Sequence, residues 1–482
     1  MLEPHIKTLD TYEKHECSFA RLGEMLFAAY AIPHQVTRDA IKQRLLGALN
    51  GELASDWLIL RRGKLRSMAL YYSAMGYLLL CSLFGTRFQK ENLEIVFDYW
   101  STSADDFYAD IISKLPSKSI AAVCFTSDKY TDCSCIPFGK MITRSHRLFS
   151  RKSAWAVLRK SYRRFGAYWA LAKEENIDFI DLVLRLLSEI AFHMTTIEGI
   201  SAKVLVSAND NGYSPYRYHI YRTSGIGKIF LIQNGCRVEV TAFYNSYIYA
   251  DYYFGWSSQR LSEFFEMRCT NKLAAGSMRL SNYLRSDKNT AGIKCDVLFL
   301  EQIHGPSYAK TSVYLQCVKN LARFASENPL LKVGYCFRPN RASFSDASSR
   351  KKIDDILGKS SLMLLNSTDG FSSYQHVSEA SLIVAFDSSL RYEALMMGKP
   401  VISCSNQDEP HDFIVRHSPP FFVVSSDDYG CFSSKLQDLL NDAGEESVAN
   451  ALSEMRSKLV SNYGSDVALT IAGLIGPELH CA

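Results

Sequence analysis

The run FDSSLRYEALMMGKPVIS (386–403) holds the residues whose types and spacing best suit nucleotide chemistry. Its first residues end a predicted strand, and Ser388 and Ser389 fall at the turn into a predicted helix. Backbone N–H groups at a helix start, together with two hydroxyls, can bind a phosphate group. Glu393 follows one helical turn later, where its carboxylate can accept hydrogen bonds from both hydroxyls of a ribose. An ordinary strand–helix–strand unit with small residues at its turn is the alternative interpretation.

Polar residues also follow other predicted strands, and these supply the catalytic candidates. Functional groups of an open α/β sheet gather at the carboxyl ends of its strands. Asp210 ends the strand candidate at 203–210, and we expect it to act as a general base or a nucleophile. The alternative is that Asp210 only caps the following turn. His304 follows the first strand of a second series and is the second candidate, with a plain loop histidine as its alternative.

Other positions at strand ends are expected to bind substrate. The strand at 228–235 ends in three residues that we assign to the acceptor side: Gln233, Asn234 and Gly235. Glu198 and Glu239 are the runners-up for the catalytic carboxylate.

The order of predicted elements indicates an α/β protein with two parallel sheets. Strand-length apolar runs alternate with helical segments from 93 to 235 and again from 296 to 441, as is typical of parallel sheets covered by helices on both faces. The polar stretch 277–295 is predicted to link the two halves. We therefore predict a helical N-terminal extension (1–90), a first Rossmann-like domain (91–285), a second one (286–455), and a C-terminal helix that packs back on the first domain (456–482).

The run 386–403 resembles the donor-nucleotide motif of GT-B glycosyltransferases, and more narrowly of bacterial transferases that build surface polysaccharides. Two further stretches resemble that group in the same order. One is NDNGYSPYRYHIYRTSGIGKIFLIQNGCR (209–237), which ends in a QNG-type turn. The other is YFGWSSQRLSEFF…KLAAGSMRL (253–280), similar to a W-G-x-x…x-x-G-S-x-R stretch, although here the order is Gly255-Trp256.

The resemblance implies a GT-B fold, in which two Rossmann-like domains face each other across a cleft. The nucleotide-sugar donor would lie on the second domain and a glycan or lipid-linked glycan acceptor on the first. Gly276 and Ser277 would lie near the donor's sugar or phosphate, at the hinge. Enzymes of this kind usually need no metal, and the sequence has no clear DxD motif, so we expect neither a metal nor a cofactor.

The donor class depends on one position. Group members that use CMP-activated Kdo or sialic-acid-like sugars carry a His-Pro pair after a strand of the second domain, where this chain has Arg338-Pro339. Arg338 can still bind a phosphate or a carboxylate, because its guanidinium makes bidentate contacts. UDP-sugars and CDP-linked polyols stay open as donors.

Three functional hypotheses follow. The first is a glycosyltransferase for capsule, O-antigen or lipopolysaccharide synthesis, with a CMP-linked sugar among its candidate donors. The second is a GT-B-fold enzyme of other chemistry, namely a sugar-nucleotide epimerase or a polyol-phosphate transferase. The third is a catalytically silent binding protein on the same fold.

Between Asp132 and Glu174 the chain has no acidic residue, while lysines, arginines and aromatic residues alternate. Basic residues interleaved with Trp and Tyr are typical of membrane-surface elements. We therefore expect the stretch 140–173 to contact a membrane surface, with a solvated helix face as the alternative. No nucleic-acid-binding motif accompanies the stretch, so nucleic acid is not an expected partner.

A second segment bears on the membrane question. Residues 67–86 are uncharged and about as long as a bilayer is thick. A membrane span, a helix on the membrane surface and a buried helix are all open for it, because tyrosines, serines and glycines make the segment only moderately apolar.

Composition excludes several classes of protein. The chain has 482 residues, of which 47% are hydrophobic and 22% are charged, so it is neither disordered nor a fibrous rod. Thirteen cysteines without a CxxC pair argue against a zinc or redox site. The N-terminus carries acidic residues and no apolar core, which is unlike a signal peptide. Together these features predict a cytoplasmic protein, peripheral at the inner face of the cytoplasmic membrane.

Overall fold

The structure is a computed structural model of the chain. It describes residues 16–48, 63–99, 105–116, 120–126, 140–145, 148–176, 179–210, 214–235, 247–262, 267–286, 293–301, 311–338, 347–367, 371–386, 388–405, 423–425, 427–441 and 446–480. The statements below concern these residues.

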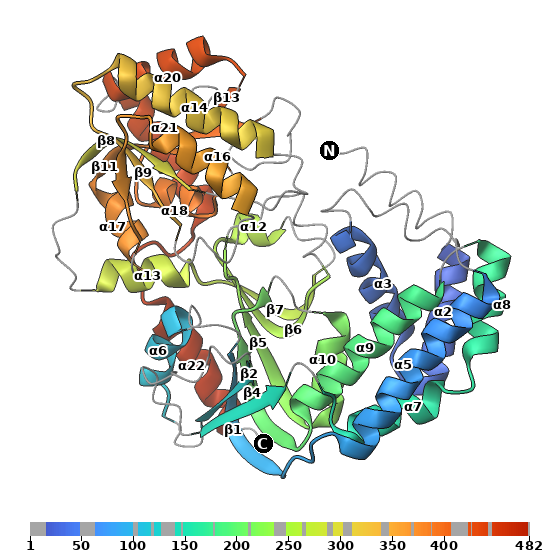
Figure 1. Cartoon of the computed structure of the whole chain (residues 1–482). Helices are drawn as coiled ribbons and strands as arrows, with labels where there is room; N and C mark the ends of the chain where they lie inside the picture. The colour runs from blue at the N-terminus through green and yellow to red at the C-terminus, as the bar shows by residue number, and fades with distance from the viewer. Residues whose placement is uncertain are drawn as a thin grey trace.

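The first sheet has seven parallel strands in the order β3-β2-β1-β4-β5-β6-β7 (Figure 1). Side chains alternate between its two faces, so that Ile95 and Phe97 enter one hydrophobic core and Val96 enters another. A sheet that is apolar on both faces needs helices on both. The strands are β1 (Glu91–Tyr99), β2 (Ile120–Thr126), β3 (Lys140–Ser145), β4 (Ile200–Ser207), β5 (Ile226–Ile232), β6 (Tyr249–Gly255) and β7 (Arg268–Ala274).

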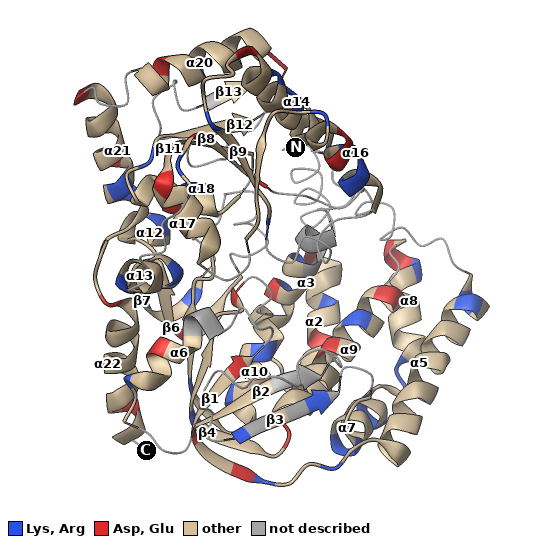
Figure 2. Ribbon diagram, turned by 60° about the vertical axis from the view of Figure 1, so that its left-hand side comes forward, with Lys and Arg blue, Asp and Glu red and all other residues tan. Residues whose placement is uncertain are grey.

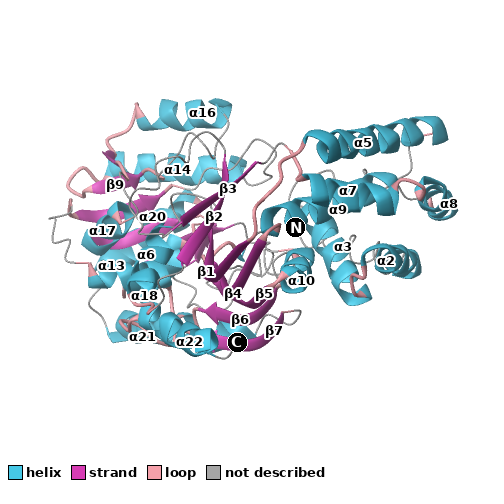
Figure 3. Cartoon of the chain, turned by 90° about the horizontal axis from the view of Figure 1, so that it is seen from below, coloured by secondary structure: helices cyan, strands magenta, loops and turns pink. Residues whose placement is uncertain are grey.

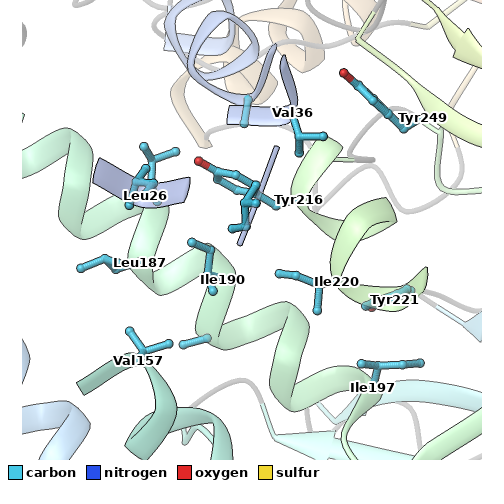
Figure 4. Close-up of a cluster of buried hydrophobic side chains, with 14 of the residues drawn as sticks. Leu26, Val36, Val157, Leu187, Ile190, Ile197, Tyr216, Ile220, Tyr221 and Tyr249 are labelled. Carbon is cyan, nitrogen blue, oxygen red and sulfur yellow. The ribbon is translucent and has the colours of Figure 1, made fainter. Parts of the chain in front are cut away.

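A thick layer of helices covers one face of the first sheet. Figure 4 shows side chains from several of these helices meeting in one core, including Leu26, Val36 and Ile190. The helices of the predicted N-terminal extension therefore share a core with the first domain and have no separate one. The layer consists of α2 (Glu16–Tyr30), α3 (His34–Ala48), α5 (Lys64–Phe84), α7 (Arg151–Ser161), α8 (Phe165–Glu175), α9 (Phe179–Ile197) and α10 (Pro215–Ser224).

The opposite face of the first sheet is covered by α6 (Asp105–Ser113) and by the last helix of the chain, α22 (Val467–His480). Ile471 and Ile475 of α22 are buried in the same core as Phe97 and Val206. The end of the chain thus lies on the domain that the first half of the chain builds, although α21 (Glu446–Leu459) packs on the second domain.

The second sheet has six parallel strands in the order β10-β9-β8-β11-β12-β13, with helices on its faces (Figure 3). Its strands are β8 (Cys295–Leu300), β9 (Val333–Cys336), β10 (Met363–Leu365), β11 (Ala380–Ala385), β12 (Val401–Ser405) and β13 (Val423–Ser425). Besides α21, its helices are α14 (Thr311–Glu327), α16 (Ala347–Leu357), α17 (Ser372–Glu379), α18 (Leu390–Met396) and α20 (Tyr429–Asn441). The predicted fold class, α/β with two Rossmann-like doubly wound domains, is confirmed.

The predicted linker 277–295 begins with a helix, which the sequence pattern did not reveal. Helix α13 (Met278–Arg285) is capped by Ser277, whose hydroxyl accepts a hydrogen bond from the Leu280 backbone N–H. Leu280 is buried in the core of the second domain, and so is Trp256, which lies just after β6. The short helix α12 (Ser258–Ser262) lies between these two residues in the chain. The described part of this connection up to residue 286 is therefore helical and packed, and its polar residues hid a buried face.

Helix α5 contains most of the uncharged segment 67–86. It is the one described helix that is long and apolar enough to cross a membrane by length and composition. One side of it is buried, with Tyr71, Met75 and Leu78 in the first domain's core. The other side is exposed.

Candidate functional site

The strand order places the candidate site at the carboxyl ends of the two sheets. In each sheet the order reverses between two neighbouring strands, β1 and β4 in the first and β8 and β11 in the second. Ligands of open α/β sheets bind beyond the carboxyl ends of the strands at such a switch point. Asp210 follows β4, and Glu301 and Ser388 follow β8 and β11.

Asp210 is held from two sides. The hydroxyl of Tyr253, on β6, donates to Asp210 Oδ2 at 3.0 Å. The backbone N–H of Asn234 donates to Asp210 Oδ1 at 3.3 Å. Asp210 is only 1% exposed. Its partners come from β6 and from the end of β5, so the carboxylate is fixed in orientation by the sheet itself.

The turn after β5 lies at the interface between the first and second domains. The Gln233 side chain donates to the carbonyl oxygen of Gly235 at 3.0 Å and accepts from the Trp256 backbone N–H at 3.0 Å. Gly235 itself approaches Ser389 so closely that a Cβ on the glycine would lie 3.5 Å from the serine Cβ. The predicted acceptor turn therefore lies next to the predicted phosphate turn.

The two serines of that turn have different environments. Ser388 is buried, and its hydroxyl accepts a hydrogen bond from the Leu390 backbone N–H at 3.3 Å. Ser389 is exposed and faces Gly235 across the junction of the domains. Helix α18, which begins at Leu390, has only seven residues. Asp387 lies outside the described residues.

Glu393 forms the second junction between the domains. Its Oε1 accepts a hydrogen bond from Ser277 at 2.5 Å, and its Oε2 accepts one from Tyr374 at 2.7 Å. Burial raises the pKa of the Glu393 carboxyl, and both hydrogen bonds and the nearby Arg279 oppose that rise. In this conformation protein hydroxyls occupy the two oxygens that we predicted to bind a ribose, so a ribose would have to displace them.

The remaining predicted hinge residue has a backbone role. Gly276 adopts φ +106, a left-handed conformation that suits glycine. Its N–H donates to the Gly255 carbonyl oxygen at 3.1 Å, next to β6. A Cβ at this position would lie 3.2 Å from Val467 at the start of α22. Gly276 thus lets three segments of the chain meet just before Ser277.

Arg338 lies beyond β9, beside the switch point of the second sheet. Its backbone N–H donates to Glu301 Oε2 at 2.9 Å, and the Tyr335 hydroxyl donates to Glu301 Oε1 at 3.1 Å. Burial lowers the pKa of the Arg338 guanidinium, Glu301 opposes that shift, and Arg279 adds to it. Arg279 therefore lies within electrostatic range of both Arg338 and Glu393.

Several sequence candidates lie elsewhere or outside the described residues. His304 and Glu239 are not described, so their predicted roles remain predictions. Glu198 accepts a hydrogen bond from Ser153 at 3.1 Å, at the start of α7 and away from the sheet ends. The described residues contain no group of three or more His, Cys, Asp and Glu side chains that could hold a metal ion.

Sequence reasoning missed two buried arginines near the strand ends. Arg391 donates to Ser403 Oγ at 2.8 Å and also to the Phe386 carbonyl oxygen, so it ties the ends of β11 and β12 together. Arg217 forms an ion pair with Asp98 at the end of β1. The only local signal for either was a charge within an otherwise apolar or aromatic run, which does not reveal its partner.

No protein-family model matches the chain, and no curated protein matches its sequence.

Solved structures with a related arrangement do exist. A UDP-N-acetylglucosamine 2-epimerase gives a TM-score of 0.47 at 11% identity, covering 80% of this chain and 95% of that one. The UDP-GlcNAc 2-epimerase from Neisseria meningitidis bound to UDP-GlcNAc gives 0.43 at 10% identity, covering 80% and 99%. A variant of the wall teichoic acid polymerase TagF gives 0.46 at 12% identity, covering 86% and 98%. At these scores and identities the likenesses assign neither an activity nor a substrate to this chain.

Proposed function

We propose that this protein is a glycosyltransferase that moves a sugar from a nucleotide-sugar donor to a growing surface glycan. One observation carries the proposal. Asp210 accepts a hydrogen bond from the Asn234 backbone N–H, and the next residue, Gly235, lies next to Ser389. A carboxylate of the first sheet and a hydroxyl turn of the second are thereby brought together at the domain junction, as transfer between a bound donor and a bound acceptor requires.

The chemistry needs a base and a stabilised leaving group. We propose that Asp210 accepts the proton of the acceptor hydroxyl while that oxygen bonds to the anomeric carbon of the sugar. The bond between this carbon and the phosphate oxygen breaks, and the nucleotide leaves with the negative charge. Ser389 and Arg338 would stabilise that charge, with Ser388 shaping the turn. If the product retains its anomeric configuration, Asp210 is instead the nucleophile.

Substrate entry requires the domains to move apart. Asp210 is buried and Ser389 lies against Gly235, so an acceptor can reach the carboxylate only after this contact opens. We propose that the packed connection around Gly276 and Ser277 is the hinge. The Ser277–Glu393 bond would then hold the closed form and release Glu393 for the ribose when the donor binds.

The donor, the acceptor and the cellular location are further proposals. A CMP-linked Kdo or nonulosonate is favoured, because Arg338 can bind both a phosphate and a sugar carboxylate. We propose capsule, O-antigen or lipopolysaccharide chains as acceptors, without a bound metal. The protein would work at the inner face of the cytoplasmic membrane.

Thermal unfolding in the presence of CMP, UDP, GDP and CDP tests the donor site. A nucleotide that binds the native state raises its unfolding temperature by mass action. Stabilisation by one nucleotide, lost on Ser388→Ala with Ser389→Ala, is the expected result. Ser457→Ala, on the exposed side of α21, is the matched control and should keep the response. Absence of a response to all four nucleotides would overturn the proposal.

A second measurement separates transfer from the alternatives. Incubation with the stabilising nucleotide's sugar conjugate should release free nucleotide only when an acceptor glycan is present. Conversion of the conjugate into an isomer without an acceptor would indicate an epimerase. Binding with no turnover under either condition would indicate a silent binding protein.

A further inference from the structure

Helix α5 presents an apolar face to solvent. Leu65, Met68, Tyr72, Leu79 and Leu83 recur at helical spacing along one side, and all of them are exposed. The adjacent row adds Tyr77, Leu80 and Phe84, of which Leu80 is 56% and Phe84 is 74% exposed. Single exposed apolar residues are ordinary, but a continuous face of this length marks an interaction surface.

The opposite face of α5 anchors the helix to the first domain. Tyr71, Met75 and Cys81 are buried in the same core as Leu158 and Tyr168. The Tyr71 hydroxyl also donates to the Ser161 carbonyl oxygen at 2.6 Å. Crossing a bilayer would strip this face from the core and leave these groups in lipid. The folded domain therefore places α5 along a surface.

Helix α7 packs beside α5, and its exposed aromatic and basic residues border the apolar face of α5. Tyr162 at the end of α7 meets Tyr72 of α5 edge to face, with ring centroids 5.7 Å apart. Trp155 is 53% exposed on α7, and three basic residues are exposed around it: Lys152, Arg159 and Arg163. Lys64 and Arg66 are exposed at the start of α5, and Arg87 just beyond its end.

Among the described residues of α5 and α7, the exposed charges are all positive. Neither the described residues 63–90 nor 148–173 include an aspartate or glutamate, and the coloured residues on α5 and α7 are basic (Figure 2). The basic stretch 140–173 does not contribute evenly, however. Arg144 is buried and donates to the Thr196 carbonyl oxygen at 3.1 Å, and Arg164 donates to the Met25 carbonyl oxygen at 3.2 Å. Among the described basic residues of the stretch, Lys152, Arg159 and Arg163 are exposed on or just after α7, whereas the exposed Lys140 and Lys173 lie on β3 and α8.

The surface lies at the far side of the first domain. Figures 1 and 3 both show α5 and α7 at the edge of the molecule, away from the second sheet and its helices. Binding there would leave the domain junction around Gly235 and Ser389 free.

We propose that the exposed faces of α5 and α7 form a docking surface for an anionic phospholipid bilayer. The α5 side chains would enter the boundary between headgroups and acyl chains, Trp155 and Tyr162 would lie at headgroup level, and the basic residues would bind anionic headgroups. A second copy of the chain fits this surface poorly, because pairing two such faces would oppose two basic rims. The inference does not depend on the proposed transfer reaction.

Cosedimentation of the full-length protein with vesicles tests the surface. Vesicles of phosphatidylcholine and phosphatidylglycerol should bind the protein, and vesicles of phosphatidylcholine alone should bind it roughly tenfold more weakly, because several lysines and arginines lose their anionic partners. Leu80→Glu with Leu83→Glu should lower binding at least about tenfold by placing charge in the apolar face. The control is Leu330→Glu, at an exposed leucine of the second domain, which should bind like the wild type.

A second readout locates the contact. Brominated acyl chains should quench tryptophan fluorescence, and Trp155→Phe should remove most of that quenching while leaving the thermal unfolding temperature unchanged. The inference is overturned if the wild type binds neither kind of vesicle, or if the Leu80/Leu83 double variant binds as well as the wild type. It is also overturned if the protein self-associates in a way that the double variant abolishes and does not bind vesicles.

Discussion

Ser277 donates its hydroxyl hydrogen to Glu393 Oε1 at 2.5 Å, although 116 positions separate the two residues in the chain. Ser277 begins α13, directly after the last strand of the first sheet, and Glu393 lies on α18 in the second domain. A single side-chain bond thus connects the end of one Rossmann-like sheet to the helix that carries the predicted donor motif. Tyr374 holds the other carboxylate oxygen.

Ser277→Ala should lower the free energy of unfolding by about 1–3 kcal/mol, since it leaves a buried carboxylate oxygen without its donor and removes the cap of α13. Urea unfolding followed by circular dichroism measures the change. The matched control is Ser262→Ala, whose exposed hydroxyl bonds only to the Gln259 carbonyl oxygen. Equal losses in the two variants would mean that the Ser277–Glu393 bond contributes nothing specific.

Glu393 should make stability fall as pH rises. Burial raises its pKa in the folded state, so folding favours the protonated form. This contribution is fully present below the unfolded-state pKa of roughly 4.3 and is lost as pH rises through the raised folded-state value. Urea midpoints of the wild type and Glu393→Gln, compared across that pH range, check the sign. A wild type that gains stability over the variant as pH rises would show that the folded-state pKa is lowered.

Asp210→Asn should reduce turnover about 100- to 10,000-fold, the usual contribution of a general base. Tyr253→Phe keeps the carboxylate and removes only the 3.0 Å bond that orients it, so it should cost less than roughly tenfold. Steady-state rates on the substrate found in the nucleotide screen supply the comparison. Equal losses in both variants would make Asp210 a structural residue and leave the base unidentified.

Arg217→Met should destabilise the protein by about 3–5 kcal/mol, because it strands the buried Asp98 carboxylate at the end of β1. Ser207 would remain as a donor to Asp98 at 2.7 Å. The exposed pair of Arg21 and Glu174 is the control, and Arg21→Met should show no measurable loss of stability. Urea unfolding of both variants compares the losses in free energy of unfolding. Equal losses would show that burial does not strengthen the dependence on the Arg217–Asp98 ion pair.

Most strand positions could be predicted because they depend on local pattern, although β3, β6 and β7 were not among the predicted strands. The apolar run LEIVFDYW (93–100) contains most of β1, and SLIVAFDSS (381–389) covers most of β11 and the serine turn after it. Their strand lengths and the helical spacing between them also indicated parallel sheets. The helix inside 277–295 escaped prediction because its polar residues outnumber the few that are buried, such as Met278 and Leu280.

The partners of the predicted polar residues could not be predicted in the same way. Asp210 and Glu393 were identifiable as carboxylates at informative positions, but not as acceptors from Tyr253 and Tyr374. Nothing local marks those tyrosines as partners of the carboxylates, because they meet only when separate elements pack together. Likewise, hydropathy identified the apolar segment that forms most of α5 but could not say which face of the helix would be covered.

The sequence alone determined that the chain forms two series of parallel strands and that small and polar residues follow several of them, because both properties are local. Tertiary structure alone decided that Gly235 lies next to Ser389, that Ser277 donates a hydrogen bond to Glu393, and that one side of α5 is left exposed beside the basic residues of α7. These relationships join residues far apart in the chain, and they depend on how the helices and the two sheets pack.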